Sequence, residues 1–278
     1  MLYIVATPIG NLADISRRAI DVLSSVDLIA AEDTRHTAKI LQTYNIHTPV
    51  VSYHDHNETE ATQRLVALIT NGTKIALVSD AGTPLIHDPG FRLVQAVKKL
   101  NIPIIPIPGP CALITALSAS GLPANRFLFL GFPPRSESQR NELFHSIVTE
   151  PGTLIFYESG QRLYDTLISL NVTLGANRKA VLMRELTKLH ETMIDGTLES
   201  IAAVINNDVM QKRGEHVLLV AGAEFNKNSK YFADERVLQV LLEELSVKQA
   251  VNLAAKITGS KPNELYRLAL LITSQYHN

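Results

Sequence analysis

Short apolar runs alternate with amphipathic segments through the first 120 residues, and this alternation limits the possible folds more than any other feature. The runs lie at residues 2–6, 27–31, 49–53, 75–78 and 103–107, and helical patterns follow at 15–26, 34–44, 58–71, 91–100 and 111–120. Each parallel strand needs a crossover, and helices must cover both faces of a parallel sheet. The pattern therefore predicts an α/β fold with a doubly wound, mainly parallel sheet.

The pattern changes at Gly121 and Pro123, which end the helix expected at 111–120. Further strands are expected at 126–132, 153–157, 179–183, 191–195 and 216–221. Two consecutive strands around Lys188 predict a mixed sheet. The polar run 224–230 is typical of a linker, and 234–276 is expected to be helical. We predict domains at 1–121 and 122–224, followed by a linker and C-terminal helical region at 225–278.

Composition excludes several classes of protein. Hydrophobic residues make up 46% of the 278 residues and charged residues 19%, which is typical of a soluble globular protein. A single cysteine, Cys111, argues against a disulfide framework and indicates a reducing cytoplasm. No apolar stretch approaches the ~18 residues of a membrane span. Because the net charge is −1, binding to RNA would depend on a local basic surface.

Glycine and proline gather in three loops that follow predicted strands, at 7–11, 80–84 and 106–111. Parallel strands end at one edge of a sheet, so these loops can form one pocket for a small molecule. Neither G-x-G-x-x-G nor a P-loop occurs in the chain. Residues 87–90, with Asp88 before Pro89, are interpreted as an ordinary helix start capped by Asp88.

Two features are interpreted as structural. His54, Asp55, His56 and Glu58 resemble metal ligands, but alternating residues of a strand point to opposite faces, so a polar loop is preferred and no metal is expected. Cys111 is interpreted as a small buried residue at a helix start, not a reactive thiol.

Five motifs carry a resemblance to a known family. VATPIGNL, DLIAAEDTRHT, VSDAGTPLIHDPG, PIPGPCALITALSASGLP and RELTKLHE closely resemble the ribosomal RNA small subunit methyltransferase I family of the tetrapyrrole methylase superfamily, the class III methyltransferases. The resemblance covers about residues 2–222 and extends more loosely through the C-terminal helices. It implies a two-domain fold, S-adenosylmethionine held between the domains, a homodimer, and 2'-O-methylation of a decoding-centre cytidine in 16S ribosomal RNA.

Carried over residue by residue, the resemblance implies a set of cofactor-binding positions. They are Pro8, Gly10, Gly82, Thr83, Pro84, Cys111, Ala112, Tyr157, Glu158, Ala221 and Gly222. The chain has Cys111 and His87 where family members often have serine. Any cofactor contact at Cys111 is therefore expected to come from the backbone.

The expected chemistry requires help from polar side chains, because a ribose hydroxyl is a poor nucleophile at neutral pH. Two polar clusters could supply it, at residues 32–36 and 184–188. Taken alone, each cluster is equally well explained by a helix cap and surface ion pairs. With the resemblance, Lys188 and Glu185 are predicted to be catalytic, and Arg17, Arg35 and Arg184 to bind RNA phosphates.

Other functions stay open at this point. A member of the same superfamily could methylate a tetrapyrrole or a protein, and a non-catalytic RNA-binding module could keep the fold. Basic residues slightly outnumber acidic ones in the C-terminal helices, and a solvated helical face explains this excess. RNA contact there is favoured only because the RNA substrate must be held somewhere. The basic residues counted are Lys227, Lys230, Arg236, Lys248, Lys256, Lys261 and Arg267.

Overall fold

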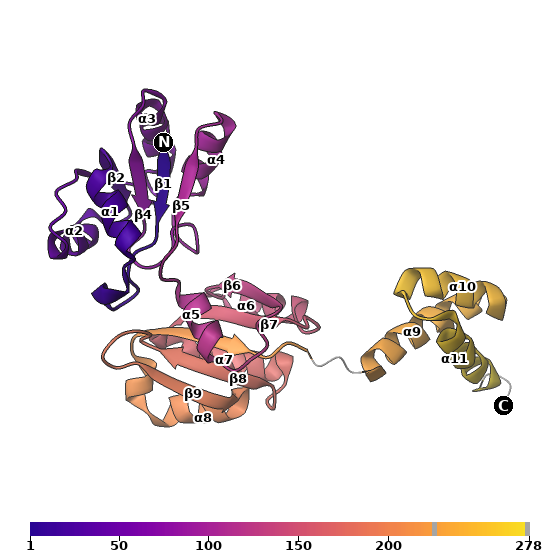
Figure 1. Ribbon diagram of the computed structural model, residues 1–278. Helices are drawn as coiled ribbons and strands as arrows, with labels where there is room; N and C mark the ends of the chain where they lie inside the picture. Colours follow the sequence, from indigo (N-terminus) through magenta and orange to yellow (C-terminus); the bar gives the residue numbers. More distant parts are fainter. Residues whose placement is uncertain (224–226, 276–278) are drawn as a thin grey trace. The chain divides into compact units, whose positions relative to one another are not determined.

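The computed structural model describes residues 1–223 and 227–275, and the side chains of Val209, of residues 227–233 and of residues 274–275 are left out of the description. It divides into two compact units, Met1–Gly222 and Ala223–Asn278 (Figure 1). The first unit contains two five-stranded sheets.

The first sheet has the strand order β3-β2-β4-β1-β5, and all its pairs are parallel. β4 is buried along its whole length, as expected for a strand covered on both faces. The strands are β1 (Leu2–Val5), β2 (Leu28–Ala31), β3 (Val50–Ser52), β4 (Ile75–Val78) and β5 (Ile104–Ile107), and the helices are α1 (Arg17–Ser25), α2 (Thr34–Thr43), α3 (Glu58–Thr70) and α4 (Phe91–Lys99).

Two apolar clusters cover the two faces of this sheet. The first packs α1 and α2 against the strands, and the second packs α3 and α4 against the opposite face. Local capping sets the helix starts: Ser16 accepts a hydrogen bond from the Ala19 N–H at 3.1 Å, and Asp33 accepts one from the Arg35 N–H at 2.8 Å. Because all the strands are parallel, their carboxyl ends lie at the same edge of the sheet.

The second sheet is mixed, with the order β6-β7-β10-β8-β9. Only β6 and β7 are parallel, and the other neighbours are antiparallel. Together with the parallel sheet and the C-terminal helices, this confirms the predicted fold class. The strands are β6 (Phe127–Gly131), β7 (Thr153–Ser159), β8 (Lys179–Arg184), β9 (Thr192–Thr197) and β10 (Glu215–Val220), and the helices are α6 (Glu137–Ser146), α7 (Gly160–Leu174) and α8 (Leu198–Asn207).

The second sheet is covered on both faces, and α5 (Ala112–Ala119) covers one of them. Leu113, Ala116 and Leu117 of α5 pack with Ile155 and Val217. Helices α6, α7 and α8 pack on the other face. The predicted boundary between residues 121 and 122 stays a prediction, although α5 shares its hydrophobic core with the second sheet.

The described part of the second unit contains three helices, α9 (Lys227–Leu242), α10 (Val247–Thr258) and α11 (Pro262–Gln275). Leu238, Val251 and Leu265 lie in its core. The turn before α11 contains Gly259 at φ +68°, and the Ser260 hydroxyl donates to buried Asp234 at 2.8 Å. Part of the linker expected at 224–230 lies outside the described residues, since 224–226 are not described, and the chain is already helical from Lys227.

Candidate active site

A pocket of the first unit lies where the parallel sheet meets the second sheet. It is lined by residues of the loops after β1, β2, β4 and β5 and by residues of β7, β8 and β10. Six predicted cofactor residues line it, namely Gly82, Thr83, Cys111, Ala112, Tyr157 and Glu158. Their cofactor role stays a prediction, but the structure brings them together.

Hydrogen bonds join the three glycine-bearing loops. The Thr7 N–H donates to Gly82 O at 2.8 Å, and the Gly82 N–H donates to Thr7 O at 3.1 Å. The Thr83 hydroxyl donates to Pro110 O at 3.0 Å. Gly82 has φ +88°, which favours glycine. The loop after β4 is therefore fixed to its neighbours and forms one wall of the pocket.

Asp88 lies in this wall, which corrects its interpretation as a helix cap. Helix α4 begins later, with Gly90 as its N-cap, and Glu58 accepts hydrogen bonds from the N–H groups of Gly90 and Arg92 at 3.4 Å. Asp88 lines the pocket instead. The unusual left-handed backbone of Leu85 and His87, at φ +73° and +69°, turns the chain so that Asp88 reaches this position.

Three carboxyl groups lie close together on this side, from Glu32, Asp80 and Asp88. The Asp80 carboxylate accepts the Asp33 N–H at 2.8 Å, and the Asp80 N–H donates to Glu32 at 3.4 Å. Burial, and then the charges of Glu32 and Asp80, raise the pKa of Asp88 to about 7. Burial and the charge of Asp80 likewise raise the pKa of Glu32. Such a site favours a positively charged ligand.

The other wall comes from the second sheet. Tyr157, Met183 and Val217 face the pocket, because they belong to the apolar cluster on the α5 side of that sheet. The Tyr157 hydroxyl accepts a hydrogen bond from the Leu113 N–H at 3.1 Å, which fixes the start of α5. Burial raises the pKa of the Tyr157 hydroxyl.

Glu158 is next to Tyr157 but its carboxylate points to the opposite face of the sheet. It accepts the Thr166 hydroxyl at 2.7 Å and the Ser159 N–H at 2.9 Å, and it lies 3.6 Å from Arg162. The residue is only 1% exposed. These contacts give the Glu158 carboxylate a structural role, and they support no more than a main-chain contribution to the pocket.

The remaining predicted cofactor positions do not line the pocket. Ala221 and Gly222 follow the far end of β10, where a Cβ on Gly222 would lie 2.0 Å from Pro151 O, so close backbone packing requires this glycine. Pro8 and Pro84 are buried within their loops. Gly10 packs against the loop that follows β8, since a Cβ on Gly10 would lie 2.5 Å from Lys188 Cγ.

An aromatic pair forms the rim of the pocket. The rings of Phe132 and His87 lie 4.8 Å apart, and the Phe132 N–H donates to His87 Nε2 at 3.4 Å. Tyr157 lies behind them, with its ring 5.7 Å from that of Phe132. Phe132 is 45% exposed, so its ring is open to solvent at the rim. No sequence pattern marks Phe132, which the structure places after Gly131, a glycine at φ +62° next to the His87 ring.

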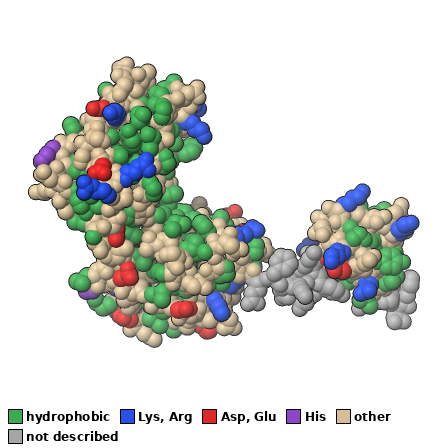
Figure 2. Space-filling view, viewed as in Figure 1, with side chains coloured by type: hydrophobic (Ala, Val, Ile, Leu, Met, Phe, Trp, Pro, Cys, Tyr) green, Lys and Arg blue, Asp and Glu red, His purple; other side chains and the backbone are tan. Residues whose placement is uncertain are grey.

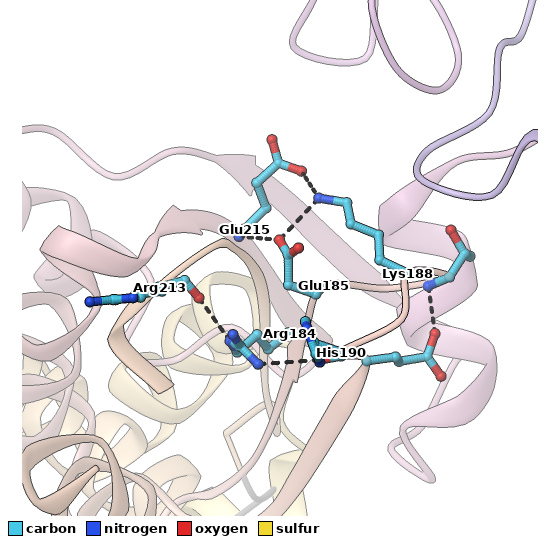
Figure 3. Close-up of polar contacts among 8 residues, drawn as sticks. Arg184, Glu185, Lys188, His190, Arg213 and Glu215 are labelled. Carbon is cyan, nitrogen blue, oxygen red and sulfur yellow. Dashed lines mark hydrogen bonds and ion pairs between the residues drawn. The ribbon is translucent and has the colours of Figure 1, made fainter. Parts of the chain in front are cut away.

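Lys188 lies between two carboxylates at the edge of the pocket (Figure 3). Its Nζ donates to Glu185 at 3.0 Å and to Glu215 at 2.9 Å. Burial opposes the charge of Lys188, but these hydrogen bonds raise its pKa above the ordinary value. Lys188 therefore stays protonated and can stabilise negative charge. Glu215 was missed in the sequence, because nothing local marks the first residue of β10 as a neighbour of Lys188.

The three predicted RNA-binding arginines differ in availability. Arg184 is 9% exposed and donates to Arg213 O at 2.8 Å and to His190 O at 3.2 Å (Figure 3). The structure thus shows a largely buried side chain that joins two loops, and contact of Arg184 with RNA stays a prediction. Arg17 and Arg35 have side chains 87% and 88% exposed, with ion pairs to Asp21 and Asp33. Such exposed pairs are weak, so both arginines can exchange them for phosphate.

Among the described residues, no group of three or more histidine, cysteine, aspartate or glutamate side chains is arranged to hold a metal ion. His54 and His56 lie with their rings 5.9 Å apart, edge to face.

Two family profiles match the chain. Residues 1–202 match the family described as Tetrapyrrole (Corrin/Porphyrin) Methylases, and residues 233–272 match the one described as RsmI C-terminal HTH domain. The chain is also 49% identical over 269 residues to the Ribosomal RNA small subunit methyltransferase I of Escherichia coli O157:H7, covering 97% of this chain and 94% of that protein. Identity to the protein of the same name from Pseudomonas aeruginosa is 48% over 271 residues, with 97% and 96% coverage.

Solved structures share the fold. A cobalt precorrin-4 methyltransferase has a TM-score of 0.60 at 13% identity, covering 79% of this chain and 94% of that one. A diphthine synthase has a TM-score of 0.60 at 16% identity, with 80% and 89% coverage. A uroporphyrin-III C-methyltransferase of Thermus thermophilus, complexed with S-adenyl homocysteine, has a TM-score of 0.55 at 16% identity, with 79% and 96% coverage. At these identities the likeness shows the fold alone.

Proposed function

Since the chain belongs to the ribosomal RNA small subunit methyltransferase I family of the tetrapyrrole methylases, we propose that it methylates the ribose 2'-oxygen of a decoding-centre cytidine in 16S ribosomal RNA. The methyl donor is S-adenosylmethionine. One observation carries the proposal: the match to rRNA methyltransferases covers 97% of the chain, including the C-terminal unit. The uroporphyrin-III-C-methyltransferase of Thermus thermophilus and the cobalt precorrin-4 methyltransferase match at 21% and 13% identity, so their acceptors are not transferred to this chain.

The pocket residues fit this methyl donor. When bound, S-adenosylmethionine supplies a methyl group activated by a positively charged sulfur. The carboxyl groups of Glu32, Asp80 and Asp88 favour a cation, and the apolar side chains of Ile86, Met183 and Val217 suit an adenosine group, so we assign the cofactor to this pocket.

Lys188 supports the acceptor side of the reaction. A ribose hydroxyl gains negative charge as it attacks, and a fixed cation lowers the energy of that state. Because Lys188 keeps its proton, we assign it to stabilising this charge, with Glu185 holding it in place.

Contacts with RNA are proposed at two places. Arg17 and Arg35 are exposed in the first unit. In the second unit, Lys256, Lys261 and Arg267 are exposed, and the face shown in Figure 2 carries more basic than acidic side chains. Phosphate contacts of this kind position RNA without reading its sequence. The side chains of Lys227 and Lys230, included in the sequence argument, lie outside the described residues.

A homodimer and a cytoplasmic location complete the proposal. The resemblance supports the dimer, and a ribosomal substrate requires access to the cytoplasm. No helix among the described residues is long and apolar enough to cross a membrane.

The test is transfer of labelled methyl from S-adenosylmethionine to small ribosomal subunits, followed by mapping of the modified nucleoside. We expect 2'-O-methylcytidine in the decoding region. Lys188→Ala should lower turnover at least tenfold without weakening cofactor binding, whereas Lys179→Ala, an exposed lysine at the far end of β8, should have no effect. Label found in tetrapyrrole or protein and absent from RNA would refute the proposal.

A further inference from the structure

The first residue of β10 places a second carboxylate at the acceptor side of the pocket. The side chain of Glu215 lies on the same face as that of Val217, which packs in the apolar cluster facing the pocket. Its Oε2 accepts the Lys188 ammonium at 2.9 Å (Figure 3). The side chain is nevertheless 82% exposed, so solvent reaches the carboxylate while the ion pair is in place.

Glu185, by comparison, is occupied by the protein itself. Its Oε1 accepts both the Lys188 ammonium at 3.0 Å and the Glu215 N–H at 2.9 Å, and its side chain is only 19% exposed. Although burial raises its pKa, the hydrogen bonds from Glu215 and Lys188 bring it below the ordinary value. Glu185 is therefore a positioning residue that stays ionised.

The backbone around this carboxylate fixes the arrangement. Gly214 has φ +90°, and a Cβ there would lie 2.6 Å from Glu185 Oε1, so only glycine lets Glu185 reach the start of β10. Glu185 and Thr187 also have positive φ, at +52° and +65°. Backbone conformations of this kind cost free energy and persist where surrounding contacts hold them, often at functional sites.

Arg184 supplies part of that support. Its guanidinium donates to His190 O, in the loop after β8, and to Arg213 O, just before β10. The loop that carries Lys188 and the strand that carries Glu215 are thereby joined. The 2.9 Å contact between Lys188 and Glu215 is thus held from the protein interior.

We propose that Glu215 accepts the proton of the ribose 2'-hydroxyl, while Lys188 stabilises the negative charge that develops on the oxygen. This inference rests on the proposed function. In the step, the O–H proton passes to the Glu215 carboxylate, the oxygen forms a bond to the methyl carbon, and the bond from carbon to sulfur breaks with its electron pair left on sulfur. Exposed Glu215 then releases the proton to water.

The acidic groups on the opposite wall are less suited to this role. The Glu32 carboxylate accepts a hydrogen bond from the Asp80 N–H, and the Asp80 carboxylate accepts one from the Asp33 N–H. Asp88 is close to both, and we assign it to the cationic methyl donor. Glu215 is the pocket carboxylate that contacts Lys188 and is also open to solvent.

The test compares Glu215→Gln with wild type in the full-length protein. Glutamine keeps the size and removes the proton acceptor, so kcat for methylation of small subunits should fall ~100-fold or more, as for loss of a general base. The Kd for S-adenosylmethionine, by calorimetry, and for small subunits should change less than threefold. NMR titration of Lys188 in the same variant should give a lower pKa, because one of its two carboxylate partners is lost.

Glu150→Gln is the matched control, since Glu150 is also ion-paired, with Arg126 at 3.0 Å, but does not line the pocket. A kcat within threefold of wild type for Glu215→Gln would overturn the inference, as would a loss of kcat matched by loss of cofactor or subunit affinity. If wild-type protein binds the cofactor but methylates no RNA, the proposed function fails instead. Methylation of RNA by wild type and by Glu215→Gln at equal rates rejects Glu215 alone.

Discussion

Replacing Gly10 by alanine tests whether the loop after β1 sets the position of Lys188. A Cβ at Gly10 would lie 2.5 Å from Lys188 Cγ, 2.8 Å from Thr187 Oγ1 and 3.0 Å from Leu186 O. Ordinary contacts begin at 3.4 Å, so Lys188 must move by about 0.9 Å or the two loops must separate. Gly10 does not have a positive φ, so alanine is not strained by its own backbone. The effect is therefore steric.

The magnitude follows from the overlap. Overpacking of this kind costs ~1–3 kcal/mol of folding stability. A displacement near 1 Å of a group that positions the reaction can lower the rate ~100-fold. Gly10→Ala should thus reduce kcat for methylation of small subunits ~100-fold, and the Kd for S-adenosylmethionine, measured by calorimetry, should change little because Gly10 does not line the pocket.

A double-mutant cycle is the control. If Gly10→Ala acts through Lys188, it should cause no further loss of kcat in a Lys188→Ala background. Thermal unfolding of each variant separates loss of folded protein from loss of turnover. A Gly10→Ala enzyme that keeps kcat within threefold of wild type would refute the steric argument.

Three further predictions concern the cofactor, the rim and the second unit. Because burial and nearby carboxylates raise the pKa of Asp88 to about 7, its carboxylate gains a proton between pH 8 and pH 6, and affinity for S-adenosylmethionine should fall ~10-fold over that range. Affinity for the product, whose sulfur is uncharged, should change less. Calorimetry at both pH values measures the two affinities, with Asp88→Asn as the control. Phe132→Leu should raise KM for small subunits ~10-fold and leave the cofactor Kd unchanged. The exposed Phe132 ring at the rim can stack on a nucleobase, and such a contact contributes ~1–3 kcal/mol to binding. Equal KM values for the variant and wild type would contradict this role. Changing Lys256, Lys261 and Arg267 together to glutamine should weaken binding of small ribosomal subunits and reduce the salt dependence of that binding, because fewer phosphates are contacted. Filter binding between 50 and 200 mM salt measures this dependence. An unchanged salt slope would rule out RNA contact by the second unit.

Local sequence patterns predicted the secondary structure well, because they depend on near neighbours. The run from Ile75 to Val78 forms the buried strand β4, and Ser16 and Asp33 cap α1 and α2 with side chains that reach only two or three residues along the chain. The predicted parallel sheet likewise placed the three glycine-bearing loops around one pocket, because parallel strands all end at the same edge of a sheet.

The same reasoning was wrong where a longer-range contact decided the outcome. Asp88 before Pro89 has the local pattern of a helix cap. In the structure, however, Glu58 of α3 accepts the hydrogen bonds from the N–H groups at the start of α4, and Asp88 lines the pocket. The local pattern also does not show that the Arg184 guanidinium donates to the carbonyl groups of Arg213 and His190; contact of Arg184 with RNA stays a prediction.

The sequence by itself determined the alternation of strands and helices, the family and the set of loops that form the pocket. Only the tertiary structure decided which carboxylates meet Lys188, which face of its strand Glu158 occupies, and that α5 covers the second sheet. Periodicity and capping act within a few residues, whereas the contact of Lys188 with Glu215 joins positions 27 residues apart through the pairing of β8 with β10. Strand register, which depends on the whole sheet, therefore sets the chemistry of the site.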